Sequence, residues 1–202
     1  GLRFRQIVGV GIALLLADSA VAQIEEVTVR AQKRDQSIQE VPLAVSAFSD
    51  EDILALSLRD VGEVLNYVPN AVRASGPSTT EDGFFFFRGV GQVDNNTNVD
   101  PGVGVYIDEV YLGRIQGASF DVLDIRSIEV LRGPQGTLFG RNTIGGAVSV
   151  HTRDPGDELA LRGRVTVGSR DQINTWLSAD VPLGEEVALT ASVFALNQDG
   201  WA

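Results

Sequence analysis

Residues 121–155 read DVLDIRSIEVLRGPQGTLFGRNTIGGAVSVHTRDP, and this stretch decides the fold. Residues 127–132 and 147–152 alternate their side chains across a pleat and are rich in β-branched residues, which predicts two strands. The turn between them is dense in glycines, which take a positive φ at little cost, and Pro134 fixes φ after the first of them. These glycines are Gly133, Gly136, Gly140, Gly145 and Gly146. The sequence therefore predicts a tightly folded hairpin, in which a side chain at Gly145 or Gly146 would collide or force an unfavourable φ.

Three charged side chains stand out in this hairpin. Glu129 lies inside an otherwise apolar strand, and Arg132 and Arg141 lie at the two ends of the turn. A charge in apolar surroundings needs a partner. We therefore expect these three side chains to meet groups from elsewhere in the protein.

Four short sequence blocks occur in this order between Ile128 and Val148, with at most two residues between neighbours: IEV, RGPQGTL, FGR and IGGAV. Together they resemble the signature near the end of the plug domain of TonB-dependent outer-membrane receptors. A shorter glycine-rich run would be better explained by a hairpin in any α+β domain, but the long contiguous match favours the receptor family. The resemblance extends more loosely from about Ile24 to the end of the chain.

The composition excludes several classes of site. At 202 residues and 44% hydrophobic content, the chain can hold one full domain and part of another. It has no cysteine and one histidine, His151, so we expect no metal site and no cofactor. A net charge of −11 argues against a nucleic-acid partner.

The sequence lacks the common motifs of enzymes. The glycine pairs at 89–91 and 102–104 have no third glycine at dinucleotide-binding spacing, and there is no GxxxxGK or GxSxG motif. A Ser-His-Asp site would have to depend on His151, which more readily lies on a strand face. The acidic run 50–52 is explained by helix capping rather than by catalysis. We predict that the chain is not an enzyme.

The first 22 residues have the pattern of a secretory signal. Arg3 and Arg5 precede an apolar core at 7–17, and Ala20-Val21-Ala22 provides small residues for cleavage after Ala22. The apolar core is too short to span a membrane, which takes about 20 residues, although a buried helix is an alternative. Because the first residue is glycine rather than methionine, we expect residues to be missing in front of it.

Residues 24–31, IEEVTVRA, can form a short strand, but the polar stretch that follows is expected to leave it unburied and with unpaired edges. A disordered leader is the alternative. The resemblance implies that this segment is the TonB box, which TonB captures by edge pairing. The box would comprise Ile24, Glu25, Glu26, Val27, Thr28, Val29, Arg30 and Ala31.

Several short elements are predicted between residues 41 and 110. A strand at 41–45 is followed by a helix with Ser49 as N-cap, which carries Ile53, Leu54, Leu56 and Leu58, and by a second helix that Asp60 caps with Glu63 and Pro69 ends. Strands are predicted at 72–74 and 84–88, separated by a polar loop, and the phenylalanines at 84–87 indicate a strand covered on both faces. A further strand is predicted at 101–110. Asp108 and Glu109 resemble part of a family motif, or are turn residues.

From about residue 161 the pattern changes to long strands. Residues 161–168, 173–181 and 187–196 alternate apolar and polar side chains, and the tight turn 182–185 joins the last two. Strands of about 9–11 residues with one apolar face are the unit of an outer-membrane barrel, although a small soluble sheet shows the same pattern. The preceding plug signature favours the barrel.

The sequence as a whole predicts an α+β plug domain, a small mixed sheet with short helices, followed by the first antiparallel strands of a transmembrane β-barrel. The expected boundaries are a signal peptide at 1–22, TonB box and linker at 23–37, plug at 38–155 and barrel strands at 156–202. A soluble periplasmic α+β binding module is the alternative.

The resemblance implies energy-coupled uptake of a scarce ligand, with a ferric siderophore as the family's default. The implied partners are TonB with its inner-membrane energising complex, outer-membrane lipid of a Gram-negative bacterium and the small-molecule ligand, and the implied receptor is a monomer. Charges at Arg88, Glu129, Arg132 and Arg141 match positions where the plug meets the barrel wall. The ligand would meet outward loops, here Asp94, Asn95, Asn96, Thr97 and Asn98.

Overall fold

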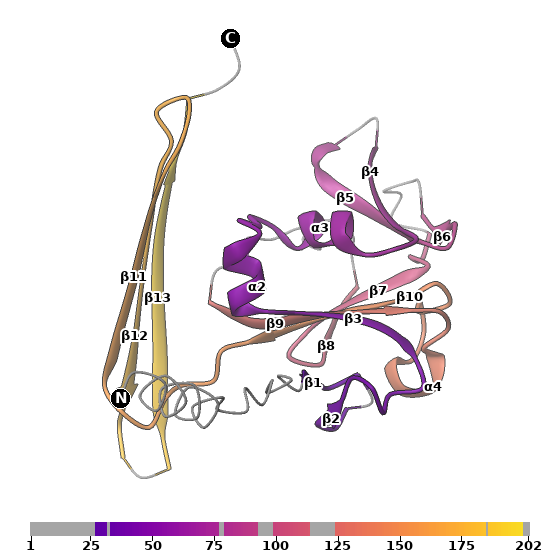
Figure 1. The fold of residues 1–202 in the computed structure, drawn as a ribbon, viewed down its shortest axis with the longest axis horizontal. Helices are drawn as coiled ribbons and strands as arrows, with labels where there is room; N and C mark the ends of the chain where they lie inside the picture. Colours follow the sequence, from indigo (N-terminus) through magenta and orange to yellow (C-terminus); the bar gives the residue numbers. More distant parts are fainter. Residues whose placement is uncertain are drawn as a thin grey trace, which may run out of the picture.

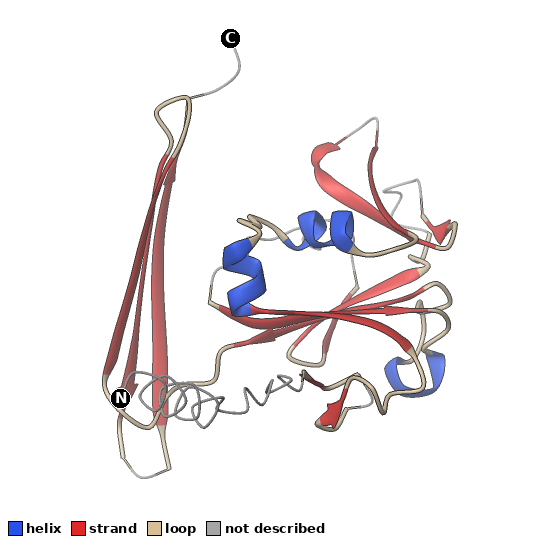
Figure 2. Cartoon of the chain, in the orientation of Figure 1, coloured by secondary structure: helices blue, strands red, loops and turns tan. Residues whose placement is uncertain are grey.

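The computed structural model describes residues 27–31, 33–76, 79–92, 99–113, 124–184 and 186–199 (Figure 1). A mixed sheet with short helices and small accessory sheets forms the first part, and a three-stranded antiparallel sheet stands beside it (Figure 2). This architecture confirms the predicted fold class of an α+β domain followed by antiparallel strands. The predicted signal peptide 1–22, the residues Ile24, Glu25 and Glu26, and the predicted ligand loop from Asp94 to Asn98 lie outside the described residues.

The central sheet has the strand order β3-β9-β10-β7-β8. Its strands are β3 (Ala44–Ser49), β7 (Val103–Ile107), β8 (Val110–Leu112), β9 (Ile125–Arg132) and β10 (Gly146–Thr152). The antiparallel pairing of β9 with β10, in register at Val130 and Val148, confirms the predicted hairpin. β10 also pairs with β7, in parallel, and this pairing places the hairpin in the middle of the sheet.

The two faces of β9 contact different parts of the chain. Ile128 and Val130 point into the main core with Val148 and Val150 of β10. Leu131 points to the opposite face, where it packs with Val29, Ala31 and Val41 in a second, smaller core. β9 is therefore covered on both sides, which explains why the four consecutive residues from Ile128 to Leu131 are all buried.

The turn between β9 and β10 contains a short helix, α4 (Gly136–Phe139). Gly133 and Gly140 take φ values of 112° and 86°, which side chains rarely adopt. Gly146 has φ 147°, and a Cβ atom there would lie 2.1 Å from the carbonyl oxygen of Leu131. A Cβ at Gly145 would meet the side chain of Val90 at 3.1 Å. Both glycines are therefore structural, and Gly146 is the stricter of the two.

Three short helical segments cover one face of the central sheet: α2 (Asp50–Ala55), α3 (Val61–Val64) and the 3-10 helix η1 (Leu65–Tyr67). Ser49 caps α2 in a reciprocal capping box with Asp52, and the Asp60 carboxylate accepts from the Glu63 amide at the start of α3. The predicted N-caps Ser49 and Asp60 are therefore confirmed, whereas the Glu63 carboxylate accepts from the Arg59 amide rather than from that of Asp60. α2 ends earlier than predicted, so Leu56 and Leu58 follow it, and Leu54 and Leu56 are exposed.

A separate sheet contains β4 (Ala71–Gly76), β5 (Thr79–Phe87) and β6 (Val90–Gly91). The prediction of a loop at 75–83 was wrong at most of these positions, because β4 and β5 continue into this stretch as a paired hairpin. Phe84, Phe85 and Phe87 are buried, as expected of a covered strand. The predicted strand 101–110 is also two strands, because Asp108 and Glu109, both at positive φ, form the turn between β7 and β8.

The three-stranded sheet contains β11 (Ala160–Val167), β12 (Ile173–Pro182) and β13 (Ala188–Asn197). Each end of these three strands lies within one residue of the predicted position. Leu161, Val165, Leu177, Leu189 and Val193 are exposed on one face, whereas Trp176, Ser178 and Asp180 are buried on the face toward the rest of the chain. In the described part of the chain no helix has the length and hydrophobicity needed to cross a membrane.

Candidate functional site

The N-terminal segment 27–31 is docked on the central sheet. β1 (Thr28–Val29) pairs with β2 (Gln36–Ser37), and the Ile38 amide donates to the Val27 carbonyl at 2.9 Å. Val29 and Ala31 are each 1% exposed. The expectation that the following polar stretch leaves this strand unburied was wrong, because the polar residues turn back and supply β2 while the apolar side chains reach Leu131.

Glu129, on β9 of the central sheet, binds this segment through a hydrogen bond. Its Oε1 accepts a hydrogen bond of 2.6 Å from the backbone amide of Arg30, and its side chain is almost fully buried. Burial raises the pKa of Glu129, and the hydrogen bond from Arg30 opposes this shift. The polar partner expected for this charge is thus a backbone amide of the N-terminal segment.

His151, on β10, lies near Glu129 on the neighbouring strand β9, and its Nε2 is 3.9 Å from Glu129 Oε1. Burial lowers the pKa of His151, and the nearby charge of Arg30 lowers it further. A neutral imidazole forms no salt bridge, so this contact leaves the Glu129 charge uncompensated. The bond from the Arg30 amide is therefore the principal stabilising contact of the carboxylate.

Arg88 and Arg132 lie near each other at the start of the turn between β9 and β10. Arg132 donates to the Pro69 carbonyl at 3.1 Å and to Ser46 Oγ at 3.3 Å. Burial lowers the pKa of Arg132, and the like charge of Arg88 adds to this effect. Arg141 is exposed. Among the described residues, none of these three arginines has a carboxylate within ion-pair distance.

A second charged network joins the central sheet to the β11–β13 sheet. Asp124 Oδ2 accepts hydrogen bonds from Ser178 Oγ at 3.0 Å and from Ser192 Oγ at 2.6 Å. Arg153 lies between Asp124 Oδ1, at 3.6 Å, and Asp50 Oδ2, at 2.5 Å. Sequence reasoning missed this network, although the alternation of β12 and β13 already placed both serines on the polar face.

The inner face of the β11–β13 sheet contains a cluster of polar side chains around Asp180. Asp180 accepts two hydrogen bonds of 2.8 Å from the Arg162 guanidinium and one of 2.8 Å from Thr190 Oγ1. One carboxylate on the middle strand thereby contacts both neighbouring strands. The bidentate contact with Arg162 joins β12 to β11, and the Thr190 hydroxyl joins it to β13.

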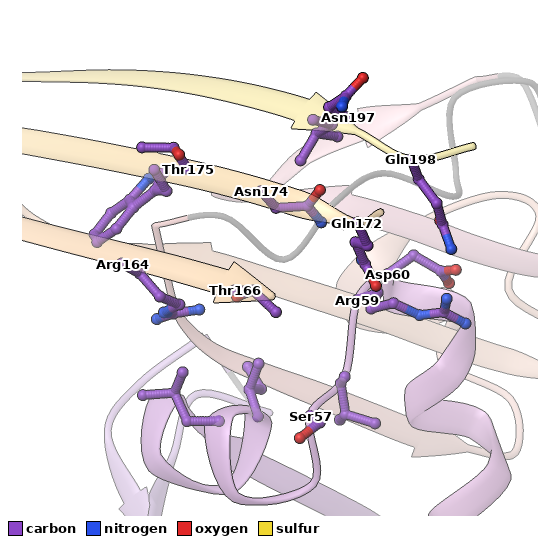
Figure 3. A pocket seen from close by; sticks show the side chains of 15 residues that line it. Ser57, Arg59, Asp60, Arg164, Thr166, Gln172, Asn174, Thr175, Asn197 and Gln198 are labelled. Atoms are coloured by element: carbon purple, nitrogen blue, oxygen red, sulfur yellow. The ribbon is translucent and has the colours of Figure 1, made fainter. Parts of the chain in front are cut away.

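A cavity of about 680 Å³ lies between the end of α2 and the β11–β13 sheet. Figure 3 shows Ser57, Arg59 and Asp60 on one side and Arg164, Gln172 and Asn174 from the strands on the other. Ile53, Leu54 and Leu58 give this cavity an apolar floor. We call it the α2–wall cavity.

The described residues contain no group of three or more His, Asp or Glu side chains that could hold a metal ion. The buried carboxylates of Glu129 and Asp180 instead accept hydrogen bonds from a backbone amide, a guanidinium and a hydroxyl. The geometry is that of a docked N-terminal segment, a charged contact between two sheets and a cavity beside it, without an assembled catalytic centre in this part of the chain.

Comparison with protein families gives a match to the TonB-dependent Receptor Plug Domain over residues 37–147. The iron-regulated outer membrane virulence protein of Vibrio cholerae is 30% identical over 182 residues, covering 82% of this chain and 26% of its own length. The vitamin B12 transporter BtuB of Photobacterium profundum is 27% identical, covering 81% of this chain and 27% of its own. The chain thus spans about a quarter of the length of these relatives.

Solved structures share the fold. The ferric yersiniabactin uptake receptor FyuA from Yersinia pestis superposes with a TM-score of 0.63 at 24% identity, over 77% of this chain and 24% of its own. The pyoverdine outer membrane receptor FpvA from Pseudomonas aeruginosa superposes with a TM-score of 0.69 at 18% identity, over 85% of this chain and 24% of its own.

Proposed function

Since the chain belongs to the TonB-dependent receptor plug family, we propose that it is the N-terminal part of an outer-membrane receptor that imports a scarce ligand with energy supplied through TonB. The family match also confirms the prediction that the chain is not an enzyme, because the family consists of non-enzymatic receptors. It removes the alternative of an unrelated soluble periplasmic module.

The docked N-terminal segment is the observation that carries this proposal. β1 has a strand neighbour on one side only among the described residues, so its other edge offers backbone groups to a partner strand. Three features attach segment 27–31 to the plug: the small β1–β2 hairpin, two buried side chains and the Arg30–Glu129 hydrogen bond. TonB, with its inner-membrane energising complex, would capture residues 24–31 by edge pairing and pull.

The other parts of the proposal follow the chain. Residues 1–22 would be a cleaved signal peptide, 23–37 the TonB box and linker, 38–155 the plug, and 156–202 the first barrel strands with their exposed apolar face in outer-membrane lipid. The receptor would act as a monomer. Arg88, Arg132 and Arg141, which lack carboxylate partners in the described part of the chain, would meet acidic groups of the remaining barrel wall.

We propose a ferric siderophore as the ligand, met on the outer side by residues 94–98. The names of several relatives support this choice, because they refer to iron regulation, to uptake of ferric yersiniabactin or to a receptor for pyoverdine. A vitamin B12 transporter is also among them, so the ligand assay should include cobalamin.

The test is Val27→Pro in the full-length receptor, with Val27→Ala as matched control. The Val27 carbonyl accepts a hydrogen bond from the Ile38 amide, and a proline at position 27 can still accept it. Proline lacks the backbone N–H that a captured strand would donate to its partner. We expect surface binding of labelled ligand to de-energised cells to persist and accumulation in energised cells to be lost. Unchanged accumulation would exclude this segment as the TonB box, and loss of binding as well would indicate misfolding.

A further inference from the structure

Two ionisable side chains are buried together beneath the docked N-terminal segment. Glu129 on β9 is 2% exposed and His151 on β10 is 7% exposed, and Glu129 Oε1 lies 3.9 Å from His151 Nε2. The register of β9 with β10 puts both side chains on the sheet face that carries Leu131, and segment 27–31 packs on this face (Figure 1). Undocking of the segment would therefore uncover both groups.

The Glu129 carboxylate is only partly satisfied in the docked state. Its Oε1 accepts the hydrogen bond from the Arg30 amide, whereas its Oε2 is buried and has no hydrogen-bond partner among the described residues. The Arg30 guanidinium pairs with Asp35, Nε to Oδ1 at 3.1 Å, and His151 Nε2 lies 3.3 Å from Ser149 Oγ. When His151 is neutral, a negative charge on Glu129 thus depends on one backbone hydrogen bond, which is a costly way to bury a charge.

The number of protons on this pair decides whether a net charge is buried. With one proton, either both side chains are neutral or a carboxylate lies beside an imidazolium, and the pair has no net charge in both arrangements. Burial raises the pKa of Glu129 and lowers the pKa of His151, so it favours the neutral form of each group. Loss of the proton leaves a buried anion, and gain of a second proton leaves a buried cation.

The other charges around the pair come from several elements and largely balance. They are Arg30 and Asp35 of the N-terminal hairpin, Asp108 and Glu109 of the turn between β7 and β8, and Arg126 of β9. β3, which pairs with β9 on its other side, contains no ionisable side chain. Tyr106 of β7 donates to the Phe139 carbonyl at 2.7 Å, and burial raises its pKa, so it stays neutral below pH 10. The proton shared by Glu129 and His151 is therefore the one that changes the charge under the segment near neutral pH.

We propose that Glu129 and His151 form a proton-dependent switch that controls docking of segment 27–31: the segment stays docked while the pair holds one proton and undocks when the pair loses it. Undocking lets water reach both groups, and in water the pair loses this proton above about pH 6.5, the ordinary pKa of histidine. The docked pair keeps the proton to a higher pH, because its loss leaves a buried anion. The docking free energy is thus fully present just below about pH 6.5 and is lost as the pH rises through the pKa of the docked pair.

The switch rests on the proposed function, because it would regulate the segment that TonB captures. The docked segment is attached to the plug, so TonB would pair with the undocked fraction. The apparent affinity for TonB would then increase in proportion to that fraction. Uptake would become more responsive to TonB as the pH around the plug rises above neutrality.

The test measures how fast a maleimide labels single cysteines in the purified full-length receptor, without TonB and in a background free of other cysteines. Val29→Cys replaces a buried side chain of the segment, and Thr28→Cys replaces its exposed neighbour. The ratio of the two rates reports the undocked fraction, because dividing by the exposed site removes the effect of pH on thiol reactivity. We expect this ratio to rise about tenfold between about pH 7 and pH 8.5, since linkage to one proton allows up to tenfold per pH unit. Val64→Cys, buried in α3, should stay unlabelled and so exclude global unfolding.

Variants of the pair decide whether its proton is responsible. Glu129→Gln keeps an acceptor for the Arg30 amide and carries no charge, so the ratio should stay low at both pH values. His151→Gln removes the second proton site, so the rise should move to lower pH, and the ratio at pH 7 should approach the wild-type ratio at pH 8.5. Glu51→Gln, which removes an exposed carboxylate of α2, is the matched control and should keep the wild-type profile.

Three results would overturn the switch: a wild-type ratio that does not change with pH, a rise that persists in Glu129→Gln, or an equal increase at every pH in His151→Gln. The last would show that the histidine has a structural role only. Because the assay contains no TonB, a flat ratio in a receptor that still imports its ligand would disprove the switch and leave the proposed function intact. A rising ratio together with unchanged accumulation in Val27→Pro would support the switch and exclude the segment as the TonB box.

Discussion

At the scale of single residues, two positions of the hairpin 125–152 show how one added atom or one buried charge affects stability. Gly146 allows β10 to start against the backbone of Leu131, and Glu129 is a buried carboxylate whose principal contact is a backbone amide. The first is a steric requirement. The second is an electrostatic one and depends on pH.

We predict that Gly146→Ala destabilises the plug by at least about 2 kcal/mol, because its Cβ would overlap the Leu131 carbonyl at a positive φ. Gly136→Ala is the matched control, since a Cβ there meets nothing within 4 Å. Hydrogen exchange of the β9 and β10 amides in the full-length receptor measures the difference. Equal exchange in the two variants would show that the turn relaxes around the new methyl group.

Glu129→Gln should stabilise the docked segment at pH 8 and have no effect near pH 4. Because burial raises the pKa of Glu129, the folded state binds its proton more readily than the unfolded chain does. The stability contributed is thus full below the unfolded pKa and lost as pH rises through the folded pKa. Glutamine keeps an acceptor for the Arg30 amide and carries no charge at any pH.

The measurement is the exchange rate of the Arg30 amide in wild type and variant at each pH. Glu129→Ala, which removes the acceptor, should expose this amide at both pH values and cost about 1–3 kcal/mol of local stability. Faster exchange in Glu129→Gln than in wild type at pH 8 would mean that the charge strengthens the bond more than its burial weakens it.

At the scale of elements, local signals in the sequence predicted most of the fold. The caps at Ser49 and Asp60, the hairpin and the three long strands all depend on side chains close in sequence, and the structure contains them. The continued hairpin at 75–83 was missed because its polar composition resembles a loop. The stretch 101–110 was predicted as one strand, but Asp108 and Glu109, for which a turn was the stated alternative, both take a positive φ and divide it.

Contacts between distant elements were the part that the sequence could not give. Nothing near Glu129 in the sequence identifies the Arg30 amide as its partner, since the two residues are 99 positions apart. Asp124 likewise reads as an ordinary residue before a strand until the fold brings Ser178 and Ser192 to it. Such pairs follow from the order of the strands, which no single stretch of sequence encodes.

At the scale of the whole molecule, the two sheets face different surroundings. The central sheet is covered on both faces, whereas β11–β13 expose a row of large apolar side chains. We predict that residues 23–202, expressed alone, are poorly soluble in water, and that a chain ending at Pro155 remains in solution. Sedimentation without detergent compares the two. A monomeric, soluble 23–202 chain would contradict the assignment of 156–202 to a membrane barrel.

The outer position of β3 has a mechanical consequence. β3 is the first strand of the central sheet after the N-terminal segment, and β9 is its single strand neighbour in the described part of the chain. Figure 1 shows β3 running across the direction of β11–β13. A pulling force applied through residue 27 along the β11–β13 direction would therefore act across β3 rather than along it. The six residue pairs between β3 and β9 would then separate one after another, starting at Ala44. Each step would break bonds of modest strength, whereas shear along the strand would have to break all of them together.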